Sequence, residues 1–320
     1  MTKNISKEEN FLLQCIFYKD KIKSNVFNDL NYDLLVKICS EHLMLPTLYY
    51  HLKKRKILSK IPAELKNYLK NIYALNRERN ETLLKEVVFL CKKLEENNID
   101  YCLTKGLAML VSGLYNDIGV RMIGDVDILV LENEKSEIVR ILNNNNYFNS
   151  HDYIKWNANV LPSFSNKDKI LSIDLHFNLL SKKFQYLIDN RKVLKDKIRF
   201  RNLNTIDFEQ NLLHSIYNYQ IDDYGFIRMS YSYRKIYDIY LLKEKIKIVN
   251  LKENKYTNSF FMISNYLKVT NHKIDIKIRD KIYLFFFLAT NKYKLIRIIN
   301  NLIYLFTKLF RDADKKIIEF

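Results

Sequence analysis

The stretch GDVDILVL, residues 124–131, has the alternation that decides the fold around it. Val126 and Ile128 recur at every second position, which is the period of a β-strand with one buried face. Asp125 and Asp127 are also two residues apart, so we expect both carboxylates to point to the opposite face. Neighbouring carboxylates repel each other unless cations neutralise them. The stretch therefore predicts a strand that carries a site for divalent cations.

A third carboxylate is expected on a later strand of the same sheet. In KILSIDLHF, residues 169–177, Ile173 and Leu175 share one face and leave Asp174 and His176 on the other. Three carboxylates suit two Mg²⁺ ions about 3.5–4 Å apart, a pair that grips the phosphates of an NTP and activates an attacking hydroxyl. Mn²⁺ is the alternative ion. His176 either orients Asp174, contacts the acceptor or is a structural histidine.

Glycine is concentrated just before the acidic stretch. The chain has five glycines, and Gly106, Gly113, Gly119 and Gly124 all fall between residues 106 and 124. Glycine is needed where the backbone turns sharply or approaches a ligand closely. The cluster indicates a ligand-facing region, although ordinary helix caps and turns would also use glycine.

Length and composition limit the class of protein. A chain of 320 residues with 48% hydrophobic residues can bury a substantial core. The net charge of +17 favours an anionic partner such as a nucleotide or nucleic acid, although an AT-rich coding bias would also enrich lysine. The four cysteines lack metal-binding spacing, and no apolar run approaches the roughly 20 residues that span a bilayer. We therefore expect a cytoplasmic protein without stable membrane insertion.

Hydrophobic spacing predicts an α+β fold. Residues 7–95 have helical spacing. Short strands are predicted at 99–104 and 125–131, with one helix at 106–115 and another that follows the second strand and ends at residue 142. Helical spacing returns from residue 208 to the end. Segments 153–164 and 169–177 are interpreted as two further strands, which form a hairpin around residues 165–168. The prediction is a small mixed sheet, residues about 96–180, with a core region at 96–200 and helical regions at 1–95 and 201–320.

Two segments near the C-terminus are strongly apolar. YLFFFLAT, residues 283–290, and LIYLFTKLF, residues 302–310, have stripes at helical spacing. We interpret both stripes as sides of helices that face the core, with a membrane-surface role as the alternative.

The motifs around the acidic stretch together resemble a known family. The chain is similar to the bacterial uncharacterised nucleotidyltransferase family of the DNA polymerase beta-like superfamily in Leu103-Thr104-Lys105-Gly106, Leu114-Tyr115, Arg121, residues 124–130 and Ile173-Asp174-Leu175-His176. The similarity extends from Tyr32 to Asp238. A Gly-Ser pair usually opens the first helix in the superfamily, whereas this chain has Lys105-Gly106, as the family does.

The resemblance implies a role for each acidic residue. Asp125 and Asp127 would ligate both ions, and Asp174 would complete the metal site beneath the acceptor hydroxyl and act as its base. Catalysis of this type rests mainly on positioning and on neutralisation of charge.

The resemblance also implies a set of nucleotide-binding residues. Lys105 and the backbone N–H groups of Gly106 and Leu107, at a helix N-terminus, would face the triphosphate. Arg121 would reach the leaving pyrophosphate. His176, Arg234 and Asp238 are added as residues of the nucleotide pocket, although the i, i+4 spacing of Arg234 and Asp238 is also that of a surface ion pair.

His214 stands apart from these motifs in an apolar helical segment. There we interpret it as a hydrogen-bonded core histidine.

The expected activity is the transfer of a nucleotide monophosphate from an NTP to an acceptor hydroxyl. An RNA end such as that of tRNA suits a basic, aromatic-rich chain. The alternatives are nucleotidylation of a protein or a small metabolite, and a catalytically silent module that binds nucleotide or RNA.

Overall fold

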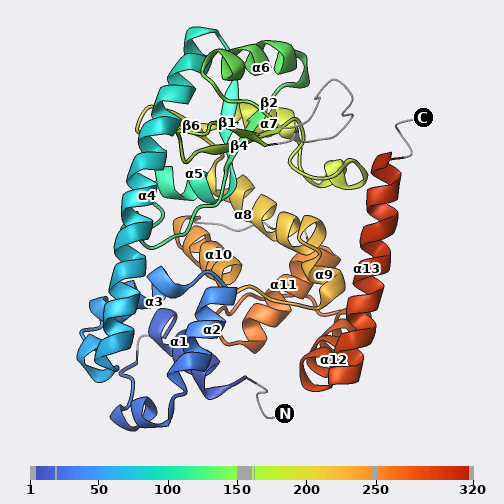
Figure 1. The fold of residues 1–320 in the computed structure, drawn as a ribbon. Helices are drawn as coiled ribbons and strands as arrows, with labels where there is room; N and C mark the ends of the chain where they lie inside the picture. Colours follow the sequence, from blue (N-terminus) through green and yellow to red (C-terminus); the bar gives the residue numbers. More distant parts are fainter. Residues whose placement is uncertain are drawn as a thin grey trace.

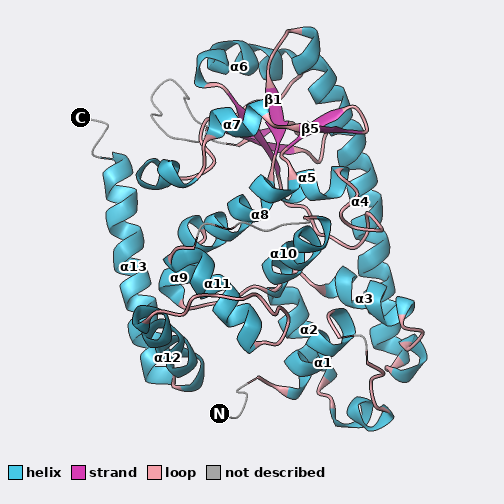
Figure 2. Cartoon of the chain, turned by 180° about the vertical axis from the view of Figure 1, so that it is seen from behind, coloured by secondary structure: helices cyan, strands magenta, loops and turns pink. Residues whose placement is uncertain are grey.

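The chain combines one mixed sheet with two groups of helices. Its structure is a computed structural model that describes residues 5–18, 20–149, 161, 163–246, 251 and 253–316, with side chains up to residue 309. The sheet lies at one end of the molecule and helices make up the remainder (Figures 1 and 2). The predicted α+β class is confirmed.

The N-terminal region is helical, as predicted. Proline marks two helix starts, since Pro46 lies in the first turn of α3 and Pro62 is the N-cap of α4. At 34 residues, α4 is about 51 Å long, and it runs from the N-terminal helices to the sheet (Figure 1). The elements are α1 (Lys7–Ile16), α2 (Tyr32–Glu41), α3 (Leu45–Lys54) and α4 (Ala63–Glu96), with 3₁₀ turns at Ser24–Asp29 and Leu58–Lys60.

The sheet has six strands among the described residues, in the order β3-β4-β2-β1-β6-β5. Strand β2 pairs antiparallel with β1 and parallel with β4, so the sheet is mixed as predicted. The parallel register places Asp127 directly beside Asp174. The strands are β1 (Tyr101–Leu103), β2 (Val126–Val130), β3 (Phe164–Ser165), β4 (Ser172–His176), β5 (Ile198–Phe200) and β6 (Leu203–Thr205).

The sheet differs from the prediction at its C-terminal limit, and one predicted strand falls largely outside the described residues. The limit near residue 180 is wrong, because the β5–β6 hairpin extends the sheet to Thr205. Strands β5 and β6 have three residues each and lie in a polar stretch without an apolar run such as the one that indicated β1, so the sequence did not indicate them. The strand expected at 153–164 lies almost entirely outside the described residues, but the hairpin around 165–168 is confirmed, since β3 pairs antiparallel with β4.

Short helices connect the sheet to the rest of the molecule. Helices α5 and α8 lie between the sheet and the other helices (Figure 1). The hydrophobic core has two clusters, one around the sheet and one among the helices, and α5 contributes Leu107 to the first and Met109 to the second. The helices are α5 (Lys105–Val111), α6 (Lys135–Asn144), α7 (Asn190–Lys195), α8 (Phe208–Tyr217) and a 3₁₀ turn at each of Glu132–Glu134 and Lys182–Leu187.

The C-terminal helices pack against the N-terminal ones, so both ends of the chain share the second cluster. Tyr237 bonds His51 at 2.9 Å, and the Tyr233 hydroxyl donates to Glu9 Oε1 at 2.9 Å. These contacts join residues about 190–220 positions apart in sequence. The elements are a π-helical turn (Asn218–Asp222), α9 (Gly225–Arg228), α10 (Tyr233–Lys245), α11 (Lys255–Tyr266), α12 (Ile278–Lys292) and α13 (Lys294–Lys316).

The interpretation of the apolar stripes as core-facing is confirmed for residues 283–290, where Tyr283 and Phe287 are buried in the second cluster, and is wrong for residues 302–309. In α12, Phe287 is buried, whereas Phe285 and Phe286 are exposed. In α13, Phe306 and Leu309 are exposed, because the side of α13 that packs on the protein carries other residues. Among the described residues, no helix is both long enough and apolar enough to cross a bilayer.

Candidate active site

Asp127 is the centre of the acidic cluster. Its side chain is only 3% exposed, and its Oδ1 accepts from Lys105 Nζ and lies 2.7 Å from His176 Nε2. Asp127, Asp174 and His176 each offer a ligand atom, and these atoms lie within 4.8 Å of one another. Burial opposes the charge of Asp127, but Lys105 and His176 outweigh it and hold the pKa of Asp127 below its ordinary range.

Lys105 is the cation that balances these acids in the structure. It is the first residue of α5 and has φ of 51°, a left-handed conformation that costs about 1–3 kcal/mol in a residue other than glycine. Burial opposes its charge, but the carboxylate of Asp127 outweighs burial and raises the pKa of Lys105. Asp125 and Asp174 act in the same direction, so all three acids lie near this ammonium group.

The other two predicted acids differ in their surroundings. Asp174 is half-buried and accepts a hydrogen bond from the Ser163 hydroxyl. Asp125 is exposed and lies outside the group of Asp127, Asp174 and His176. Partial removal from water and the charge of Asp127 together raise the pKa of Asp125. Asp125 therefore lies at the open side of the cluster.

The donor set fits a divalent cation. Carboxylate oxygens are the ligands that Mg²⁺ and Mn²⁺ prefer, and two carboxylates in register on adjacent strands present such oxygens together. His176 bonds Asp127 instead of Asp174, the partner weighed from the sequence. A histidine that bonds a ligating carboxylate fixes the orientation of that carboxylate, which is a common feature of metal sites.

Arg121 and Asp238, both predicted in the nucleotide pocket, bind each other. Arg121 Nε and Nη2 donate to the two carboxylate oxygens of Asp238 at 2.9 and 2.8 Å. Tyr115 donates to the same carboxylate, and Arg121 Nη1 donates to the Met122 carbonyl at 2.9 Å. Burial opposes the charge of Asp238, but Arg121 outweighs it and lowers the pKa of Asp238. This buried pair joins α10 to the loop that leads into β2.

Gly106 is required by this pair. A Cβ at residue 106 would lie 2.4 Å from Arg121 Nη1, and Arg121 has no room to move while Asp238 holds it from both oxygens. We expect Gly106→Ala to lower the free energy of unfolding by about 1–3 kcal/mol. Urea unfolding followed by circular dichroism measures this change.

Gly124 provides the matched control. Nothing lies within 4 Å of a Cβ at this position, and its φ is not left-handed. Gly124→Ala should be neutral or stabilise by up to about 1 kcal/mol. Equal effects of the two substitutions would contradict the assignment of Gly106 as a site of close approach.

Helix α4 holds the loop that carries Arg121. The Asn76 amide donates to the carbonyls of Gly119 and Arg121 at 2.8 and 3.2 Å, and the Asn80 amide donates to those of Ile118 and Arg121 at 2.6 and 2.8 Å. Both asparagines are buried. These residues were not predicted as part of the site, although two asparagines four apart on one helix are the available signal.

Arg234 lies beside the Arg121–Asp238 pair without a comparable partner. Its Nε is buried and has no hydrogen-bond partner among the described residues. Burial and the positive charge of Arg121 lower the pKa of Arg234. The neighbouring Lys235 is paired, since its Nζ donates to Asn218 Oδ1 at 3.1 Å. Arg234 is therefore a cation available to an anion.

His214 is buried as predicted, but it is not hydrogen-bonded. It is 0% exposed, and neither ring nitrogen has a partner among the described residues. Burial, followed by the positive charge of Lys105, lowers the pKa of His214 to about 3. Burial likewise lowers the pKa of His51 to about 4.

These two histidines predict a loss of stability in mild acid. Below pH about 6.5 each takes up a proton in the unfolded chain and not in the folded one, so the free energy of unfolding should fall by about 1.4 kcal/mol per pH unit for each. Urea unfolding between pH 7 and pH 5 measures the slope. His214→Leu should have a shallower slope, and an unchanged slope would show that His214 titrates in the folded protein.

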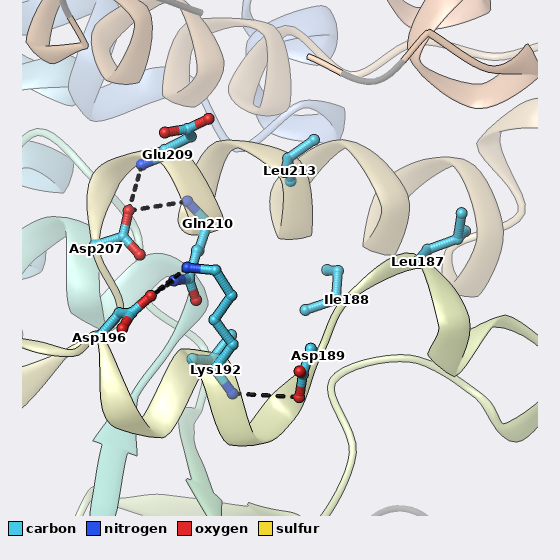
Figure 3. Close-up of a pocket in the computed structure, with 10 residues that line it drawn as sticks. Leu187, Ile188, Asp189, Lys192, Asp196, Asp207, Glu209, Gln210 and Leu213 are labelled. Atoms are coloured by element: carbon cyan, nitrogen blue, oxygen red, sulfur yellow. Dashed lines mark hydrogen bonds and ion pairs between the residues drawn. The ribbon is translucent and has the colours of Figure 1, made fainter. Parts of the chain in front are cut away.

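The pocket in Figure 3 lies away from the acids. It has a volume of about 390 Å³ and lies between α7 and the start of α8. Its acidic residues serve local structure, since Asp189 caps α7 and Asp207 caps α8. None of the predicted site residues lines this pocket.

Comparison with known proteins gives one match and one negative result. No curated protein matches the sequence. The sequence profile of a family described as uncharacterised nucleotidyltransferase matches residues 28–251, which is more than half of the chain and includes every predicted site residue. The chain therefore belongs to the uncharacterised nucleotidyltransferase family.

Proposed function

We propose that the chain transfers a nucleotide monophosphate from an NTP to an acceptor hydroxyl, with Mg²⁺ held by Asp125, Asp127 and Asp174. The observation that carries this proposal is the register of β2 and β4, which places Asp127 beside Asp174 while His176 and Lys105 converge on Asp127. Family membership supports nucleotide transfer in general. Bound Mg²⁺ would neutralise the phosphates and favour the deprotonated acceptor hydroxyl.

Each side chain then has a distinct part. His176 keeps the Asp127 carboxylate in one orientation through the 2.7 Å contact. The half-buried Asp174 accepts the proton of the acceptor hydroxyl. Exposed Asp125 binds the cation at the open side of the cluster, where partial removal from water and the charge of Asp127 raise its pKa and a cation would oppose that repulsion.

The phosphates would be bound by cations that border the acids. Lys105 pairs with Asp127, and the charges of Asp125 and Asp174 also raise its pKa, so it would contact the triphosphate once other cations neutralise Asp127. Arg234 has a buried Nε without a hydrogen-bond partner in the described part of the chain, which suits a phosphate oxygen. Gly106, Arg121 and Asp238 shape this part of the pocket, since the buried ion pair rests on the Gly106 backbone.

An RNA end is the proposed acceptor. The support is the net charge of +17, which favours a polyanion. Protein and small-metabolite hydroxyls are the other acceptors that the experiment must separate.

Label transfer tests the proposal directly. The protein is incubated with each α-³²P-labelled NTP, with or without Mg²⁺, and with purified RNA, a protein extract or a metabolite extract. We expect label on RNA only when Mg²⁺ is present. Label on a protein or a metabolite would show that this molecule, and not RNA, is the acceptor. No label in any mixture would favour a catalytically silent binding module.

A further inference from the structure

Helix α13 has an apolar stripe that faces away from the protein. Leu295, Phe306 and Leu309 are 69%, 63% and 67% exposed, and Leu302 is also exposed. These residues recur at helical spacing, so they share one side of α13. From Leu295 to Leu309 the stripe is about 21 Å long.

The opposite side of α13 is the one that packs on the protein. Tyr304 makes an edge-to-face contact with Tyr224 at 5.2 Å, and the Arg228 guanidinium lies over the Tyr304 ring at 5.1 Å. Asn300, one turn earlier, is buried. Helix α13 stands at the edge of the molecule, where α9 and α12 are the helices beside it (Figure 1). The apolar stripe is therefore not needed to hold α13 in place.

The charged residues between 281 and 309 are all positive, and Asp312 and Asp314 follow the stripe among three further basic residues of α13, which outnumber them. Lys294 and Lys308 are exposed and lie by helical spacing on the same flank of the stripe, whereas the Arg297 guanidinium donates to the carbonyls of Thr290 and Asn291 at the end of α12. Between residues 278 and 309 the acidic residue is Asp280, which is buried. A second copy of this face would bring like charges together, which disfavours self-association.

We propose that α13 binds the surface of an anionic lipid bilayer and lies in the plane of that surface. A helix with Leu, Ile and Phe on one side and Lys and Arg beside them is the arrangement of interfacial helices. Helix α12, which packs beside α13, also exposes apolar residues, including Ile278 and Phe285. The family match ends at residue 251, so this surface lies outside it.

Vesicle flotation with the full chain tests the proposal. One vesicle type is phosphatidylcholine, and the other replaces part of it with phosphatidylglycerol. We expect the wild type to bind the anionic vesicles at least about tenfold more tightly. Phe306→Gln/Leu309→Gln should weaken this binding by about tenfold or more, and Lys294→Gln/Lys308→Gln by about fivefold per lysine.

A matched control separates the stripe from exposed apolar residues in general. Leu75 in α4 is 62% exposed, and Leu75→Gln should bind as the wild type does. All variants replace exposed side chains, so their melting temperatures should equal that of the wild type.

Three results would overturn the proposal. The first is absence of binding to both vesicle types, and the second is unchanged binding by both α13 double variants. The third is that, without vesicles, the wild type forms a dimer or binds an acidic protein and Phe306→Gln/Leu309→Gln does not. None of them depends on nucleotide transfer, so the proposed activity stands or falls separately.

Discussion

Asp127→Asn is expected to lower nucleotide transfer by about a thousandfold or more, because it removes the charge at the centre of the site. Asparagine keeps an Oδ1 that can accept from Lys105 and His176, so the neighbours stay in place. Single-turnover transfer of labelled nucleotide gives the rate, and urea unfolding gives the stability. A large loss of rate with little loss of stability would assign Asp127 to catalysis.

Asp168→Asn is the matched control. Asp168 is an exposed acid in the β3–β4 hairpin, and its backbone N–H donates to Asn166 Oδ1 at 2.9 Å. The same change of charge at this position should leave the transfer rate unchanged. If Asp127→Asn and Asp168→Asn had equal rates, the proposed metal site would be wrong.

Asp238→Asn is expected to lower the free energy of unfolding by about 3–5 kcal/mol. Asp238 is 1% exposed and Arg121 is 6% exposed, so removal of one charge leaves the other buried without its counter-ion. The change also weakens the contact that Tyr115 makes with this carboxylate. Urea or thermal unfolding measures the loss.

Two further variants test the physical reason. Arg77 pairs with Asp117 near the same loop, but Arg77 is exposed, so Arg77→Gln should cost only about 0–1 kcal/mol. Arg121→Met/Asp238→Leu removes both charges and should recover part of the loss seen in Asp238→Asn. An Asp238→Asn protein as stable as Arg77→Gln would show that the buried pair does not stabilise the fold.

The sequence predicted the elements that have a clear period. Strands β2 and β4, the helices on both sides of the sheet, and the mixed sheet itself followed from alternation and helical spacing. A third carboxylate, Asp174, was also expected on a later strand, and the structure places it beside Asp127. The strands β5 and β6 were missed, because each is short and lies in a polar stretch, whereas the equally short β1 lies in an apolar run.

Local sequence patterns did not predict which residues, far apart in sequence, contact each other in the fold. Arg234 and Asp238 are four apart on α10, yet Asp238 binds Arg121, which is 117 positions away in sequence. The spacing of the two asparagines of α4 places them on one side of the helix but does not show that they hold the loop before β2. The apolar stripe of α13 looked like a core-facing side, since spacing reports amphipathicity and not which surface covers the apolar side.

The sequence by itself therefore determined the order of the elements and the three acids, because alternation on a strand is set by the backbone. Only the tertiary structure decided which charges meet. The parallel register of β2 and β4 sets Asp127 beside Asp174, and the packing of α10 against the Arg121 loop sets the buried pair. Contacts between residues far apart in sequence depend on how the elements pack, which no local period specifies.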